Sequence, residues 1–213
     1  MQGTARVPPH VTARVIAHCG VAHPFADLLA GETLVVIDPQ IEFTDDAIGN
    51  AVCPGGHNIV PRLNMLAGAL CGAGSGVFWV MDTFGLCAVE EWGSLLAKLT
   101  PQARARREAT MTEGSVGQQR RPLFDGWAAD SIVRKQRISS SLPCESDLED
   151  LPRTRGFDAA PIAGPVTYAR YKSTARDATV LNFCTVMVSD ANAAMTPEEH
   201  RARCSDSTRC SAT

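Results

Sequence analysis

Short apolar runs recur along the chain and alternate with longer stretches in which apolar residues return every three or four positions. A continuous apolar run of a few residues is typical of a strand that is covered on both faces of a sheet, and the wider spacing is typical of an amphipathic helix. Five such runs predict strands over residues 33–37, 76–81, 131–135, 159–163 and 184–188.

Helix-length stretches separate the predicted strands, and several of them have recognisable ends. Gly72 and Gly74 end the first stretch. Thr196, Pro197 and Glu199 start another, because they supply an N-cap, a proline at the first helical position and the glutamate of a capping box. We predict helices over residues 58–71, 89–99, 101–110, 147–155 and 174–181 and from 196 onward, with a surface loop over 114–129.

The alternation of strand and helix predicts an α/β fold of three layers, α/β/α, in which a doubly wound, mostly parallel sheet lies between helices. The chain has 213 residues, which suits one domain of about 150 residues with short additions. We assign residues 1–30 to an N-terminal extension, 31–202 to the α/β domain and 203–213 to an irregular C-terminal tail.

Charge and hydropathy exclude several classes of protein. The 20 Lys and Arg against 23 Asp and Glu give a net charge of −3, so nothing favours nucleic acid or an anionic membrane as a partner. No apolar run approaches the roughly 20 residues of a membrane span, and the N-terminus lacks the apolar segment of a secretion signal. We interpret Arg104, Arg106, Arg107, Arg120 and Arg121 as solvated surface and not as a basic patch.

Eight cysteines are spread along the chain without a Cys-x-x-Cys pair. In a chain of this length, that scatter favours reduced thiols in a cytoplasmic protein over a disulfide framework. The same scatter offers no clustered zinc ligands, and we predict neither a metal nor a cofactor.

Three predicted strand ends carry residues with candidate chemistry, since ligands of a doubly wound sheet bind at the carboxyl ends of its strands. Asp38 follows the first strand, where a carboxylate is either a general base or a helix N-cap. Lys135 ends the third strand, where it either stabilises negative charge or is solvated. The turn after the fourth strand leads into a helix N-terminus suited to an oxyanion or a thiolate, yet it carries Arg170 and Lys172.

Three segments resemble, in the right order, the motifs of the isochorismatase-like cysteine hydrolases, which include nicotinamidase and N-carbamoylsarcosine amidase. They are Thr33-Leu-Val-Val-Ile-Asp-Pro-Gln40, Val133-Arg-Lys-Gln-Arg137 with Ser139, and Ser173-Thr-Ala-Arg-Asp-Ala178. The resemblance implies the fold of that family and hydrolysis of a C–N bond in a small amide or carbamoyl compound by an Asp–Lys–Cys mechanism. Asp38 matches the position of the family's acid–base aspartate, and Lys135 matches the position of its lysine. The resemblance also assigns substrate contacts to Gln40, Arg137, Ser139 and Thr167.

The nucleophile departs from the family motif. Counted back from Thr174, the family's cysteine falls on Arg170, and the one thiol that we place near the cleft is Cys144. Two interpretations stay open at this point. The chain is either a hydrolase impaired by loss of its thiol, or an inactive member that serves as a small-anion-binding or interaction module. In both cases we expect a small amide or carboxylate as ligand, and a homo-oligomer weakened by the altered tail, residues 204–213.

Overall fold

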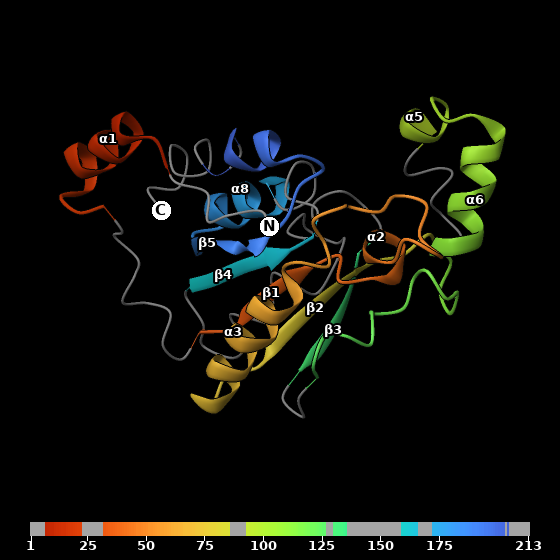
Figure 1. Ribbon diagram of the computed structural model, residues 1–213, viewed down its shortest axis with the longest axis horizontal. Helices are drawn as coiled ribbons and strands as arrows, with labels where there is room; N and C mark the ends of the chain where they lie inside the picture. The colour runs from red at the N-terminus through yellow and green to blue at the C-terminus, as the bar shows by residue number, and fades with distance from the viewer. Residues whose placement is uncertain are drawn as a thin grey trace.

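The computed structural model describes residues 7–22, 32–85, 93–126, 130–135, 159–165, 172–202 and 204, and its centre is one parallel sheet (Figure 1). Its strands are β1 (Leu34–Ile37), β2 (Val77–Asp82), β3 (Ser131–Lys135), β4 (Ala159–Gly164) and β5 (Cys184–Asn192). Their order across the sheet is β3-β2-β1-β4-β5. The five predicted strands and the α/β class are confirmed, and β5 extends beyond its predicted end at residue 188.

Helices cover both faces of this sheet, as a doubly wound fold requires. The side chains of β1 alternate between two cores: Leu34 and Val36 pack with α3 (Val60–Gly72), whereas Val35 and Ile37 pack on the side of α8 (Lys172–Val180). Because both faces are covered, all four residues of β1 are buried, which explains the continuous apolar run in its sequence.

The other helices agree only in part with the sequence pattern. They are α1 (Pro9–Cys19), α2 (Ile41–Thr44), α5 (Gly93–Leu96) and α6 (Pro101–Met111), and residues 197–202 are helical as well. α1 has no counterpart among the predicted helices. Of the helix predicted over 89–99, residues 93–96 are helical, 97–99 are not, and 89–92 lie outside the described residues, as does all of 147–155. The division into 1–30, 31–202 and 203–213 stays a prediction.

The segment over residues 117–121 runs alongside the residues that follow β1. Ile41 donates its backbone N–H to Gln119 O at 3.0 Å, and Arg121 donates to Pro39 O at 2.9 Å. The described part of the loop predicted over 114–129 contains no helix or strand, in agreement with the prediction. These bonds fix the chain immediately after Asp38 against a segment distant in sequence.

Gly164 brings the carboxyl end of β4 against the end of β1. Its φ of 148° is a conformation that L side chains rarely adopt. A Cβ atom on Gly164 would lie 2.2 Å from the carbonyl oxygen of Ile37, which directly precedes Asp38. Only glycine permits this close approach of the two strand ends.

We predict that Gly164→Ala lowers the free energy of unfolding by about 2–4 kcal/mol, because backbone atoms must move to admit the methyl group. Chemical denaturation monitored by circular dichroism measures the change. Gly72→Ala is the matched control: no atom lies within 4 Å of its added Cβ, so its stability stays within about 1 kcal/mol of the parent. Equal stability of the two variants would contradict the prediction.

The helix after β5 begins as the sequence predicts and contains a buried histidine. Thr196 Oγ1 accepts a hydrogen bond from the backbone N–H of Glu199 at 3.1 Å, which confirms the N-cap. His200 is 3% exposed, and its Nε2 lies 3.7 Å from Cys204 Sγ. Burial lowers the pKa of His200 below its ordinary value of 6.5, and a backbone contact at Ser189 opposes this shift in part.

We predict that the free energy of unfolding decreases as the pH falls below about 6.5. In that range the unfolded chain binds a proton at His200 while the folded chain keeps the ring neutral, so protonation favours unfolding. Denaturation midpoints between neutral and mildly acidic pH measure the effect. His200→Gln reduces this pH dependence, whereas the same substitution at exposed His10 leaves it in place; an unchanged slope in His200→Gln would sink the prediction.

Candidate functional site

Asp38 and Lys135 form a buried ion pair at the carboxyl edge of the sheet. They follow β1 and end β3, on either side of β2, and Lys135 Nζ lies 3.0 Å from Asp38 Oδ1 with both side chains 0% exposed. Asp38 has a φ of 58°, and its backbone N–H donates to Val80 O on β2. The helix N-cap alternative for Asp38 is wrong, since the N-cap of α2 is Gln40, and so is the solvated alternative for Lys135.

A second ion pair lies on the strand between them. Asp82 ends β2, directly beside Lys135 in the strand register, and its Oδ2 lies 3.1 Å from an Arg107 terminal nitrogen on α6. The Asp82 side chain is 1% exposed and that of Arg107 is 19% exposed. The prediction that Arg107 is solvated surface is therefore wrong. Carboxylates and cations from three strands and one helix meet at this edge.

Gln40 holds the ends of β1 and β2 together. Its Nε2 donates to Asp82 O at 2.7 Å and to Gln118 O at 2.9 Å, and its Oε1 accepts from the Asp82 N–H at 2.7 Å. The side chain is 0% exposed, and Gln118 in turn donates to Thr83 Oγ1. These three bonds of the Gln40 amide all reach main-chain atoms, so its visible role is to position Asp82. Its contact with substrate stays a prediction.

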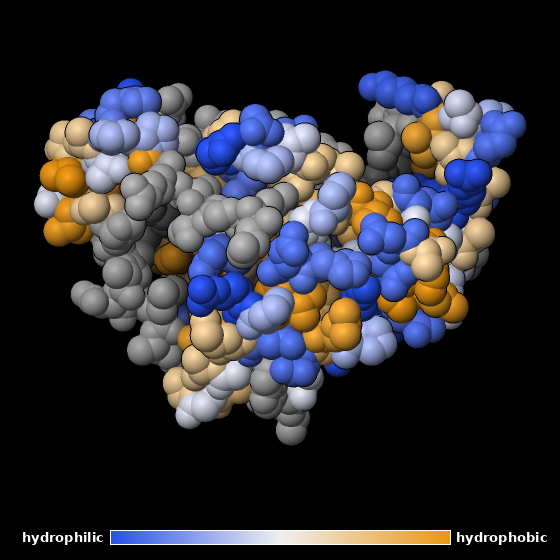
Figure 2. Space-filling model, in the orientation of Figure 1, coloured by the Kyte–Doolittle hydropathy of each residue, from blue (hydrophilic) through white to orange (hydrophobic). Residues whose placement is uncertain are grey.

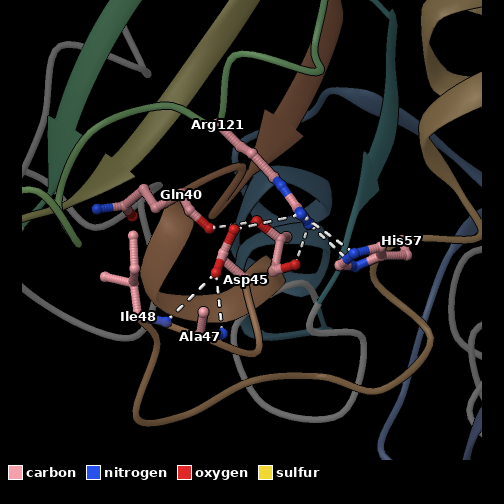
Figure 3. A network of polar contacts seen from close by, with 7 residues as sticks. Gln40, Asp45, Ala47, Ile48, His57 and Arg121 are labelled. Atoms are coloured by element: carbon pink, nitrogen blue, oxygen red, sulfur yellow. Dashed lines mark hydrogen bonds and ion pairs between the residues drawn. The ribbon is translucent and has the colours of Figure 1, made fainter.

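Arg121, in the segment over residues 117–121, holds the loop between α2 and α3 in place (Figure 3). One terminal nitrogen donates to Thr44 O and lies 3.0 Å from His57 Nδ1, and the other lies 3.1 Å from His57 Nε2 and 3.4 Å from Asp45 Oδ2. Arg121 is buried, so its assignment to solvated surface is wrong. It stabilises the loop beside Asp38.

Arg120 is not simply solvated either. Its guanidinium lies 4.8 Å from the ring centre of the buried Trp79 and donates to Phe124 O at 2.7 Å. Arg106, in contrast, is exposed on α6, as predicted. No local pattern in the sequence indicates the partners Thr44 and Trp79, because they lie tens of residues away from the arginines.

Several predicted site residues lie outside the described part of the chain. They are Arg137, Ser139, Cys144, Thr167 and Arg170. Of the predicted site, the structure thus brings together Asp38, Lys135 and Gln40 at one edge of the sheet. Their assigned roles in catalysis and binding stay predictions.

Three of the five described thiols are poorly suited to nucleophilic attack. The described cysteines, which are Cys19, Cys53, Cys71, Cys184 and Cys204, form no disulfide with one another. Burial raises the pKa of Cys53 and Cys71 above the ordinary value of 9.0 and raises the pKa of Cys204 to about 11. These three thiols stay protonated at neutral pH, and the thiolate is the reactive form.

The described part of the chain has neither a cluster of metal ligands nor a membrane span. No group of three or more His, Cys, Asp or Glu side chains there is placed to hold a metal ion. No described helix is both long enough and apolar enough to cross a bilayer.

Solved structures with the same fold include several hydrolases. An isochorismatase-like hydrolase from Alkaliphilus metalliredigens superposes with a TM-score of 0.69 and 22% identity, covering 86% of this chain and 90% of that one. N-carbamoylsarcosine amidase from Thermoplasma acidophilum gives 0.63 and 22%, covering 79% and 87%. Nicotinamidase from Bacillus subtilis gives 0.65 and 21%, covering 84% and 94%. These similarities show the fold.

The sequence itself carries the family assignment. Among curated protein sequences, none matches this chain significantly. Residues 32–212, however, match the profile of the isochorismatase domain. That match covers most of the chain, including all five strands and the Asp38–Lys135 pair. The chain therefore belongs to the isochorismatase family and has its hydrolase fold.

Proposed function

We propose that this protein is a hydrolase-type domain for the C–N bond of a small amide or carbamoyl compound, in which Arg170 replaces the nucleophile and suppresses turnover. The observation that carries the proposal is the buried Asp38–Lys135 pair at the carboxyl edge of the sheet. Two structures of the same fold are named as amidases, which supports this bond type.

The energetics of the pair favour a chemical role over a structural one. Removing two ions from water costs several kcal/mol each, and their attraction in the protein offsets that cost only with good geometry. Apolar residues of similar size would fill the same space at equal or lower free energy. Asp38 also has a positive φ, which is a strained conformation for a residue other than glycine. Strained backbone conformations of this kind concentrate at functional sites.

In an Asp–Lys–Cys mechanism, the thiol attacks the carbonyl carbon and gives its proton to the aspartate, here Asp38. Collapse of the tetrahedral intermediate breaks the C–N bond, and Asp38 returns the proton to the leaving nitrogen. Water then cleaves the thioester. Lys135, whose Nζ lies 3.0 Å from Asp38 Oδ1, stabilises negative charge in the transition state.

Arg170 cannot take the place of the thiol in this sequence of steps. A guanidinium remains protonated in proteins and offers no lone pair for attack on a carbonyl. Four of the five described thiols do not supply a substitute, because burial keeps Cys53, Cys71 and Cys204 protonated and Cys184 lies at the amino end of β5, away from the carboxyl edge. Of the thiols outside the described residues, Cys144 is the one that we place near the cleft, and we propose that turnover depends on position 170 and not on Cys144.

A second function, binding of a small anion, is favoured by the charge at the start of α8. This helix begins with Lys172 and has no acidic residue in its first turn. The positive end of the helix dipole disfavours cations there unless an anion is bound. Arg170, two positions earlier in sequence, adds a second cation. In this alternative the domain is inactive and binds a small carboxylate or phosphate.

The compartment, the ligand and the self-association of the protein are inferred from its sequence. We propose a cytoplasmic protein that acts on or binds a small amide or carboxylate. We also propose a homo-oligomer whose contacts are weakened by the Ser-, Thr- and Cys-rich composition of residues 204–213.

We predict that the parent chain releases no ammonia from nicotinamide, carbamoyl or maleamate-type amides, and that Arg170→Cys does. The gain is about a thousandfold or more above background, since loss of a nucleophile removes most of the catalysis. A coupled ammonia assay measures it. The matched control, Arg170→Cys with Asp38→Asn, stays silent because the thiol lacks its base.

The two candidate functions give different results. Ammonia release by the parent chain that iodoacetamide blocks would refute the assigned role of Arg170. A folded Arg170→Cys that stays silent on every amide would refute the hydrolase proposal. Binding of inorganic phosphate or acetate that Arg170→Ala abolishes supports the anion-binding alternative, and calorimetry that finds no such binding removes it.

We further predict that Lys135→Met lowers the free energy of unfolding by about 3–5 kcal/mol, because it leaves the Asp38 carboxylate buried and unbalanced. Adding Asp38→Asn to it restores most of that stability. Denaturant titration measures both variants. Arg134→Met on the same strand is the control: its pair with Glu113 is exposed, so it changes stability by less than about 1 kcal/mol. A double variant no more stable than the single one would contradict this view of the pair.

A further inference from the structure

Arg107 is the most accessible of the four charged side chains at the ends of β1, β2 and β3 that the structure describes. Asp38 and Lys135 are 0% exposed and Asp82 is 1% exposed, whereas Arg107 is 19% exposed. Each carboxylate is thus withdrawn from solvent, and part of one cationic side chain is not. Of these four side chains, Arg107 therefore has the most surface that a ligand could contact.

The fold holds Arg107 in place at this edge. Arg107 and Met111 lie one turn apart on α6, and Met111 is 0% exposed. The carbonyl oxygen of Met111 accepts a bond of 2.8 Å from Phe84, two residues beyond the end of β2. The C-terminal half of α6 is thereby fixed to the chain that leaves the sheet. In the space-filling view the outline is notched between α8 and the arm formed by α5 and α6 (Figure 2).

Asp82 orients the guanidinium of Arg107, and 19% of the Arg107 side chain remains exposed. The contact is 3.1 Å from Asp82 Oδ2 to one terminal nitrogen, and Gln40 fixes the backbone of Asp82 on both sides. A guanidinium carries five N–H groups that point outward in one plane, so it can contact carboxylates on two edges. An arginine that is already oriented loses little entropy when it binds a second carboxylate.

We propose that Arg107 binds a carboxylate of the ligand, so that the site prefers amides carrying an anionic group over neutral amides of the same length. The proposal rests on the proposed function for the place where the ligand binds. Arg107 then determines specificity, with Asp82 as its positioning residue. The expected ligand is therefore a short amide with one free carboxylate. It is long enough to reach from Arg107 to the Asp38–Lys135 pair.

Calorimetric titration of the full chain with succinamate and with succinamide tests this preference. The two probes have the same carbon skeleton and differ in one terminal group, a carboxylate against a neutral amide. Succinamate binds at least about tenfold more tightly, as expected for one charge-assisted bidentate contact. In Arg107→Gln the two affinities become equal within about threefold. Arg104→Gln, on the same helix and paired with Glu108, keeps the preference.

Two further variants keep the test decisive. Arg107→Lys retains the charge beside Asp82 without the planar fork, so it folds and keeps only part of the preference. Arg170→Ala keeps the preference if Arg107 carries it. Equal affinity of the parent for both probes, no binding of either at millimolar concentration, or an unchanged ratio in Arg107→Gln overturns the proposal.

The outcome is separable from the test of hydrolysis, since binding is measured without turnover. A silent Arg170→Cys together with a preference for succinamate refutes the hydrolase function and leaves the role of Arg107 standing. An active Arg170→Cys without that preference refutes the role of Arg107 alone.

Discussion

The attraction between Asp38 and Lys135 across the end of β2 is the constraint on which the arrangement of the carboxyl edge of the sheet depends. It requires that β1 and β3 lie on either side of β2 with their carboxyl ends level, which the parallel order β3-β2-β1 provides. Because both ions are out of water, small displacements would be costly, and neighbouring contacts limit them. Gln40 joins the ends of β1 and β2, and Gly164 lets β4 approach β1.

The sequence predicts the sheet well because burial on both faces leaves a local signal. All four residues of β1 and all six of β2 are buried, and both strands contain a continuous apolar run, which in β2 precedes Asp82. Asp38 can be located because it follows such a run, whereas Lys135 ends β3, in which exposed and buried residues alternate. α1 escapes prediction although Pro9 at its first position and Gly20 at its C-cap mark its ends, since only Val11 and Val15 are buried between them.

The partners of the arginines could not be predicted from the sequence. Arg107 belongs to a polar helix, and nothing near it in sequence indicates that it pairs with Asp82 at the end of β2. Arg121 bonds to the backbone of Thr44, 77 residues away. The role of a charged side chain depends on its partners in the tertiary structure, whereas apolar periodicity is a local pattern in the sequence. A segment's sequence therefore predicts its burial better than it predicts its ion pairs.

The charge of the residue at position 170 affects which ligand the proposed cleft can bind. Asp38 with Lys135, and Asp82 with Arg107, form two pairs that are each neutral overall. A thiolate at position 170 adds one negative charge to them, whereas the guanidinium of Arg170 adds one positive charge. If Arg170 occupies the nucleophile position, as proposed, the same substitution therefore reverses the net charge of the proposed cleft. A bound carboxylate balances that charge in a region of low dielectric, where an uncompensated cation is unfavourable. In the anion-binding alternative, the residue at position 170 thus accounts both for the proposed loss of catalysis and for binding of a small anion, whereas Arg107 is proposed to select between an anionic and a neutral amide.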